Sequence, residues 1–373
     1  MKVLVLSPEK KDRKSRQRRR LIVRSLEGLK TQLLNPAYGR PPEKKTFRPS
    51  LFPAVFYQHE LKVLLKADLV IADLTEADFK TGFLVSQALS LKKPVLGLFE
   101  GTLSGSAEFN WKNDDLLFTE CFNRDNIHSI IDHFLIFVKR ERGRKGKLIV
   151  IEGGDGSGKA TQLEALVNYF KSKGEKIKTL DFPLYYSSFH GGMVGRYLKG
   201  EFGGLSQVNP YLASLTFSLD RLLAKSEIEE WLKKGYIIIA NRYVTSNMAH
   251  QTVRVNGKEQ EKFLSWLLEM EYKVHRLPKE DLVVFLHVPS EIGQKLVDKK
   301  GQRGYVKGRD IHEANQKYLE KVGKMYLRLS KRFRHWEKVD CLGENGKLLS
   351  IDEIHQKIIS VLAKRGIISE KDK

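Results

Sequence analysis

Cysteine is scarce in this chain of 373 residues, which contains two, Cys121 and Cys341. Their wide separation excludes a disulfide-rich secreted scaffold and gives no zinc-site spacing. Long hydrophobic runs are also missing, since none reaches the roughly 20 apolar residues of a membrane-spanning helix. The apolar part of the N-terminus, MKVLVLSPEKK, is too short for a secretory signal. We therefore expect a cytoplasmic protein without a membrane segment.

Acidic residues are outnumbered by basic ones, 45 against 66, which gives a formal net charge of +21. Such an excess favours an acidic partner, and nucleotide substrates, which are polyanions, would be sufficient. The densest basic stretch, residues 10–24 (KKDRKSRQRRRLIVR), could bind nucleic acid through phosphates. No aromatic residues lie among these basic ones, as single-strand binding would require. We favour the alternative that the stretch is the solvated start of an amphipathic helix continuing through Leu33.

Residues 139–147 (KRERGRKGK) are charged, contain glycine and have no apolar side chain, as is typical of a linker. They divide the chain into two predicted domains, residues 1–138 and 148–373. In both, short apolar runs alternate with helical patterns, which predicts α/β folds on parallel sheets. The predicted strands are 2–7, 67–75, 93–99, 148–151, 177–182, 236–240 and 281–288. The predicted helices include 56–66, 83–91, 127–139, 209–223, 226–234, 263–273, 312–332 and 351–365.

Residues 149–162 (IVIEGGDGSGKATQ) connect a predicted strand to a predicted helix through a glycine-rich turn. This order predicts a phosphate-binding loop, because glycines let backbone N–H groups turn inward and the helix N-terminus adds positive charge. Lys159 is then placed to reach the β- and γ-phosphates of a nucleotide. The predicted nucleotide-binding residues are Gly153, Gly154, Asp155, Gly156, Ser157, Gly158, Lys159, Ala160 and Thr161.

Several motifs of the second domain resemble those of the thymidylate kinase family and occur in that family's order. They are GGDGSGKATQ at 153–162, DFPLY at 181–185, YLKGEFG at 197–203, NPYLASLTFSLDR at 209–221, NRYVTSNMAHQ at 241–251 and DIHE at 310–313. The resemblance covers residues 147–365. It implies the P-loop nucleoside monophosphate kinase fold and Mg²⁺-dependent phosphoryl transfer from ATP to dTMP. A homodimer is expected from this resemblance alone.

The resemblance also implies roles for residues of the acceptor site. Arg242 becomes the clamp on the acceptor phosphate, and Asp155 contacts the deoxyribose 3′-hydroxyl. Phe217 and Arg221 lie four residues apart and so share one helix face, where Phe217 stacks on a pyrimidine and Arg221 donates to its carbonyl edge. The predicted dTMP-binding residues are Asp155, Phe182, Phe217, Arg221, Arg242, Ser246, Asn247 and Gln251.

A basic segment before residue 310 supplies the remaining catalytic candidates. The phosphate-binding loop contains no arginine, whereas this segment contains Arg303, Lys307 and Arg309. The chain therefore resembles the family members that take a catalytic arginine from the lid over the site. Arg303 and Arg309 are the candidates, beside Lys159 and Arg242.

Two positions depart from the family pattern. Ala160 stands where a Ser or Thr hydroxyl contacts Mg²⁺, with Thr161 one residue later, and Asn241 replaces the aspartate of the DRY motif. Both positions normally help to organise Mg²⁺, so no metal ligand is assigned. The departures leave open a catalytically weakened, nucleotide-binding regulatory protein. Another pyrimidine monophosphate, such as dUMP, also stays open as the acceptor.

Residues 67–91 of the first domain resemble the nucleoside 2-deoxyribosyltransferase family, including its deoxynucleotide N-hydrolase relatives. Asp73 and Thr75 match the family's strand motif and Gly82 its helix start, but Leu84 occupies the position of the catalytic glutamate. A leucine cannot attack a glycosidic carbon. Glu76 or Asp78 could substitute, although neither stands at the matching position. The resemblance implies a flavodoxin-like fold and a non-catalytic domain with a nucleotide-sized cleft at residues 73–82.

Overall fold

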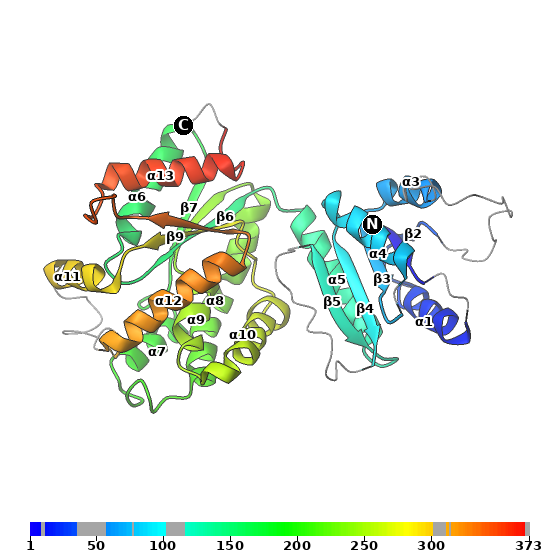
Figure 1. Ribbon diagram of the computed structural model, residues 1–373, viewed down its shortest axis with the longest axis horizontal. Coiled ribbons are helices and arrows are strands. Elements are labelled where there is room, and N and C mark those ends of the chain that lie inside the picture. The colour runs from blue at the N-terminus through cyan, green and yellow to red at the C-terminus, as the bar shows by residue number, and fades with distance from the viewer. Residues whose placement is uncertain are drawn as a thin grey trace. The chain divides into compact units, whose positions relative to one another are not determined.

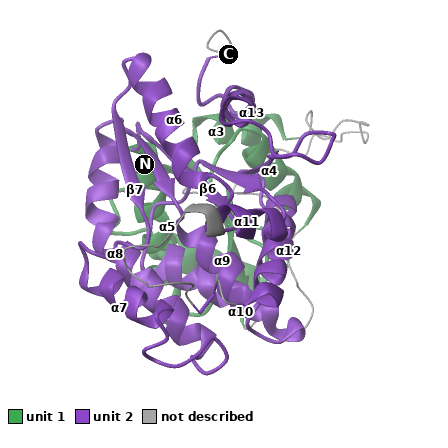
Figure 2. Ribbon diagram, turned by 90° about the vertical axis from the view of Figure 1, so that its left-hand side faces the viewer, with its two compact units in different colours: residues 1–143 green, residues 144–373 purple. Residues whose placement is uncertain are grey.

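The computed structural model describes residues 1–8, 12–35, 57–76, 78–101, 116–300, 311–312 and 315–369, without the side chains of 298–300. The chain divides into two compact units, residues 1–143 and 144–373 (Figure 2). Their boundary falls within the segment predicted as a linker. Most of that segment is regular structure, because helix α5 (Ile127–Arg142) fills its start and strand β6 (Lys147–Gly153) begins at its last residue. The basic residues in the last turn of α5 are favourable at a helix C-terminus.

Unit 1 contains a five-stranded parallel sheet with the order β2-β1-β3-β4-β5. Its strands are β1 (Lys2–Leu6), β2 (Gln32–Leu33), β3 (Leu69–Asp73), β4 (Val95–Glu100) and β5 (Leu117–Phe122). Its other helices are α1 (Arg13–Arg24), α3 (Gln58–Lys66) and α4 (Phe79–Ser90). Side chains of β1 alternate between two cores, one shared with α1 and α5 and the other with α3 and α4. The parallel α/β architecture predicted for this unit is confirmed.

Two details of unit 1 differ from the prediction. The helix expected to continue through Leu33 ends at Arg24, because residues 32 and 33 instead pair as a short edge strand with Lys2 and Val3. Strand β5 was not predicted. It lies at the other edge of the sheet and is only partly buried, so its sequence lacks a continuous apolar run.

Unit 2 contains a second five-stranded parallel sheet, with the order β10-β9-β6-β8-β7. Its other strands are β7 (Ile177–Asp181), β8 (Ile237–Asn241), β9 (Leu282–His287) and β10 (Trp336–Asp340). Helices α6 (Lys159–Ser172) and α13 (Ile351–Lys364) cover one face (Figure 1). The other face packs against α8 (Pro210–Lys233), α9 (Val244–Thr252), α10 (Gln260–Leu268) and α12 (Gln316–Arg332). Helices α7 (Phe189–Leu198) and α11 (Ser290–Lys300) complete the described part of the unit.

Four features of the helices and strands of unit 2 differ from the prediction. The two helices expected at 209–223 and 226–234 form one helix, α8, because no residue between them breaks the helix. The helix expected at 263–273 stops being α-helical at Leu268 and continues as a π-helical turn, η2 (Glu269–Val274). Helix α9 and the edge strand β10 were not predicted.

Strand β6 lies at the centre of this sheet, between β8 and β9. Parallel pairing brings the carboxyl ends of β6, β7 and β8 to one edge: Ile151 pairs with Asn241, and Asn241 with Asp181. Open α/β sheets bind ligands outside this edge. No helix among the described residues has the length and apolar character needed to cross a membrane.

Candidate active site

The predicted phosphate-binding loop connects the carboxyl end of β6 to the start of α6, as the sequence indicates. Gly156 has φ +76°, and a Cβ there would lie 2.1 Å from the carbonyl oxygen of Gly293 in α11. A Cβ at Gly293 would lie 2.4 Å from the carbonyl oxygen of Asp155. Two glycines are therefore needed for the loop to pack against α11. Gly293 was not identified from the sequence, because its partner is distant along the chain.

Lys159 is the first residue of α6 and is folded over this loop. Its Nζ donates to the carbonyl oxygens of Gly153, at 3.0 Å, and Gly154, at 2.8 Å. Only 8% of the residue is exposed. The ammonium group is thus already positioned beside the backbone that would surround a phosphate chain.

Arg242 follows directly after β8 and has a left-handed backbone conformation, with φ 65°. This conformation is uncommon for a residue with a side chain and is typical of functional sites. Its Nη2 forms an ion pair with Asp155 Oδ1 at 2.6 Å, while Nη1 lies 3.3 Å from both Ser246 Oγ and His250 Nε2. Burial lowers the pKa of Arg242, but the charges of Asp155, Tyr326 and Glu152 together outweigh this effect, and the pKa is raised. A permanent cation therefore lies against the predicted phosphate-binding loop.

Glu152, the residue before the loop glycines, is a fully buried carboxylate. It accepts hydrogen bonds from Thr245 Oγ1 at 2.6 Å, Ser246 Oγ at 2.9 Å and Tyr326 Oη at 2.7 Å. Because Ser246 also accepts from Arg242, Glu152 fixes one of the groups that hold the arginine. In the sequence, Glu152 stands out as a charged residue at the end of an apolar strand. Charged groups are rarely fully buried unless they are paired, so this position indicates that Glu152 has partners.

Glu271, from the π-helical turn η2, brings two of the predicted site residues together. This carboxylate is fully buried and accepts from Arg221 Nε at 3.3 Å, from Arg221 Nη2, from Ser218 Oγ at 2.8 Å and from Asn247 Nδ2 at 3.1 Å. Arg221 of α8 and Asn247 of α9 therefore share one counter-ion. Glu271 was not identified from the sequence, because nothing in the local pattern indicates the π-helical turn.

The other predicted acceptor-site residues differ in exposure. Phe217 is partly buried and packs edge-to-face on Tyr197, with 6.0 Å between ring centroids. Phe182 is 3% exposed and packs against Tyr243 in the core. Gln251 is buried, and its Oε1 accepts from Arg254. The predicted lid residues Arg303, Lys307 and Arg309 lie outside the described residues.

Two histidines that were not predicted form a stack, of which His250 contacts Arg242. His250 and His312 stack with ring centroids 5.7 Å apart and planes inclined by 14°. Burial lowers the pKa of His312 to about 3 and that of His250 well below its ordinary value. Both rings are therefore neutral near pH 7. A neutral His250 can accept from Arg242 at Nε2 while its Nδ1 pairs with Tyr318 Oη at 3.0 Å.

The donors near the loop are oxygen atoms, the kind of ligand that Mg²⁺ prefers. No group of three or more His, Cys, Asp or Glu side chains in the described ranges could hold a metal ion. Ser157 Oγ and Asn241 Oδ1 are buried without a hydrogen-bond partner there, and Asp155 and Asp181 supply carboxylates. Oxygen donors in small number fit Mg²⁺, which phosphotransfer sites hold through one or two carboxylates and substrate phosphates.

In unit 1, the residues compared with the deoxyribosyltransferase pattern form hydrogen bonds, ion pairs and core contacts within the unit. Asp73 is fully buried and accepts from Arg18 Nε at 2.8 Å. Leu84 is fully buried in the core shared by α3 and α4. Of the two substitutes considered, Asp78 caps α4 by accepting from the Thr81 amide, and Glu76 lies 3.6 Å from Arg18 Nη2.

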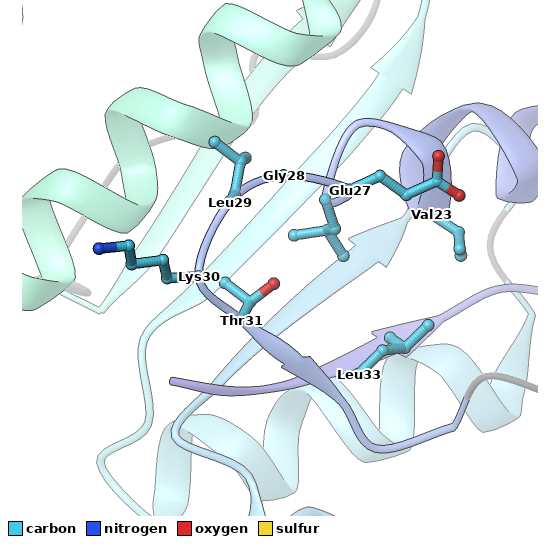
Figure 3. Close-up of a pocket in the computed structure, with 8 residues that line it drawn as sticks. Val23, Glu27, Gly28, Leu29, Lys30, Thr31 and Leu33 are labelled. Carbon is cyan, nitrogen blue, oxygen red and sulfur yellow. The ribbon is translucent and has the colours of Figure 1, made fainter.

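A hollow in unit 1 lies between the end of α1 and the start of β2 (Figure 3). It is lined by residues that include Val23, Leu26, Leu29, Thr31 and Leu33. Residue 32 pairs with Lys2, so the hollow is at the amino ends of the strands. Asp73 is at the carboxyl end of β3, so the hollow is not the cleft predicted at residues 73–82.

Comparison with known proteins gives the class of this chain, a nucleoside monophosphate kinase. A sequence model of the family "Thymidylate kinase" matches residues 151–358, within unit 2. The chain belongs to the thymidylate kinase family, as the ordered motifs indicated.

The relatives of the chain include thymidylate kinases from distant organisms. The enzyme of Mycobacterium tuberculosis is 34% identical over 184 residues, which is 49% of this chain and 85% of the relative. That of Plasmodium falciparum is 30% identical over 231 residues, 61% of this chain and 95% of the relative. A solved structure of a thymidylate kinase from Candida albicans aligns with a TM-score of 0.45 and 26% identity, covering 60% of this chain and 93% of the other.

Proposed function

We propose that this protein phosphorylates dTMP with ATP, giving dTDP and ADP. The observation that carries the proposal is that Lys159 on the phosphate-binding loop and the Asp155–Arg242 pair meet at one edge of the sheet. Membership of the family and the names of its relatives support the same activity. Phosphoryl transfer between nucleotides requires a site for each phosphate and positive charge between them, which this edge offers.

On the donor side, we propose that residues 153–161 bind the ATP phosphates and that Lys159 donates to them. Lys159 Nζ would then exchange its hydrogen bonds to two loop carbonyl oxygens for hydrogen bonds to phosphate oxygens. Bound Mg²⁺ would neutralise charge on the phosphates, and Asp155, Asp181 and Ser157 are the nearby oxygen donors that suit it. On the acceptor side, Arg242 would bind the dTMP phosphate. Its guanidinium group is positioned by hydrogen bonds to Ser246 and His250.

Base recognition follows from the atoms that Arg221 and Asn247 leave available. Within the described residues, Arg221 uses Nε and Nη2 for Glu271 and Nη1 for the Tyr243 carbonyl, which leaves two of its five N–H groups. The Asn247 amide nitrogen donates to Glu271 and Ser214, so only its oxygen can meet a ligand. Together they offer a donor and an acceptor. Thymine and uracil present the matching carbonyl and N3–H, whereas cytosine presents an amine and an unprotonated nitrogen.

The test is a coupled assay of ADP release with the full chain, ATP, Mg²⁺ and each of dTMP, dUMP and dCMP. We expect turnover with dTMP, and kcat/KM for dCMP lower by about 10²–10⁴-fold, because two buried polar groups would lose their partners at about 1–3 kcal/mol each. Nucleotide binding without ADP release from any acceptor would instead support the catalytically weakened regulatory protein. Equal turnover of dCMP and dTMP would contradict the assigned base contacts.

For unit 1 we propose a non-catalytic, flavodoxin-like domain. The strand order β2-β1-β3-β4-β5 is the one found in flavodoxin-like sheets, which supports the resemblance to deoxyribosyltransferases. The buried Leu84 supports the loss of their chemistry, because no carboxylate stands at that position.

We accordingly expect no free base to be released from deoxynucleosides or deoxynucleotides. The measurement is chromatographic detection of thymine after incubating the full chain with dTMP or thymidine. An Asp73→Asn variant is the matched control for any trace of contaminating hydrolase. Thymine release that disappears in this variant would show that unit 1 is an enzyme.

A further inference from the structure

Asp181 and Asn241 are the last residues of two neighbouring strands, β7 and β8, and pair with each other in register. The Asn241 side-chain nitrogen donates to Asp181 Oδ1 at 2.8 Å. Asn241 also pairs with Ile151, two residues before Gly153, and Arg242 follows it. The two side chains therefore lie at the sheet edge that carries the phosphate-binding loop.

Each member of this pair keeps one oxygen available. Asn241 Oδ1 is buried and has no hydrogen-bond partner in the part of the chain that the structure describes. Asp181 is accessible to solvent, and Asn241 is its side-chain partner there, through Oδ1. Because the amide holds one carboxylate oxygen, it fixes the direction of the other.

The surroundings of Asp181 are positively charged. Desolvation at the strand ends raises the pKa of Asp181, while the Asn241 hydrogen bond and the charges of Arg242 and Lys159 act in the opposite direction. The carboxylate is thus within electrostatic reach of the cations assigned to the donor and acceptor phosphates. A divalent cation bound with ATP would occupy the same region.

We propose that Asp181, oriented by Asn241, supplies the carboxylate that holds the divalent cation of bound ATP. The family motif carries an aspartate at position 241, and this chain has an amide there. In this chain the carboxylate of the pair stands on β7, and the residue on β8 is an amide. Since Ala160 offers no hydroxyl, this carboxylate becomes more important for the cation. The proposal rests on the proposed function only in taking ATP as the bound nucleotide.

The experiment measures binding of Mn²⁺, followed by its electron paramagnetic resonance signal, to the full chain with a non-hydrolysable ATP analogue. We expect Asp181→Asn to weaken binding of the Mn²⁺–analogue complex by about 10–100-fold, the range typical of lost metal-supporting groups. Binding of the analogue without metal should stay the same or tighten, because a negative charge has been removed. Exchanging the two residues, Asp181→Asn with Asn241→Asp, should restore most of the lost affinity.

Asn241→Ala is the second variant, because it keeps the carboxylate and removes only its orientation. We expect a smaller loss, about 3-fold, and an unchanged metal-free affinity. An Asp181→Asn protein that binds the Mn²⁺ complex as the wild type does would overturn the proposal. So would an equal loss of affinity with and without metal, which indicates a structural role. Neither readout requires an acceptor, so failure of dTMP phosphorylation in the wild type would be distinguished from failure of this site.

Discussion

Lys159→Ala is expected to lower kcat for dTMP phosphorylation by about 10³-fold while changing dTMP affinity by less than about 2-fold. Removing one preorganised donor to developing charge typically costs about 10²–10³-fold in rate, and we propose that this lysine also positions the donor phosphates. Its Nζ lies on the donor loop, bonded to the carbonyl oxygens of Gly153 and Gly154. Arg221 and Asn247, the residues proposed for the acceptor base, instead donate to Glu271.

The measurements are steady-state kinetics for the rate and titration calorimetry for dTMP binding without ATP. Lys171→Ala is the matched control, because Lys171 is an exposed lysine of the same helix. It should leave both quantities unchanged. A loss of dTMP affinity as large as the loss of rate would show that Lys159 serves the acceptor or the fold of the loop.

The residues that the sequence could identify are those whose role depends on local pattern. Strands β6, β8 and β9 are buried on both faces and therefore read as continuous apolar runs. The glycine-rich loop between β6 and α6 requires left-handed backbone at Gly156 and Gly158, so its glycines are visible in the sequence. Arg242 follows an apolar strand and was recognised as part of a motif.

The residues that the sequence could not identify act through partners far along the chain. Glu271 meets Arg221 across 50 residues, and Glu152 meets Tyr326 across 174. Such contacts have no local period or spacing. The edge strands β5 and β10 were missed for a different reason, because their partly exposed sequences lack a continuous apolar run. The Asp181–Asn241 pair likewise depends on the register of two strands that are 60 residues apart.

Arg242→Ala is expected to weaken dTMP binding by about 10²-fold. Charge-assisted hydrogen bonds to a phosphate contribute about 1.5–3 kcal/mol, and the substitution also leaves the carboxylate of Asp155 without its partner at 2.6 Å. Arg242→Lys should lose about 10-fold, because an ammonium group cannot reproduce the contacts that the planar guanidinium makes with Asp155, Ser246 and His250 together. Calorimetric titration of dTMP measures both losses. Arg328→Ala, which removes a surface arginine of α12, is the control and should bind dTMP normally.

The backbone conformation of Arg242 allows a test of whether its side chain binds phosphate or has only a structural role. Its φ of 65° is unfavourable for any residue with a Cβ, by about 1 kcal/mol or more. Arg242→Gly should therefore unfold at a higher urea concentration than Arg242→Ala, while binding dTMP equally weakly. Equilibrium urea denaturation and the same titration give the two quantities. Acceptor affinity that stays at the wild-type value in both variants would mean that Arg242 only braces Asp155. Weak binding in a more stable glycine variant would show that the chain maintains a strained backbone here because the guanidinium binds the acceptor phosphate.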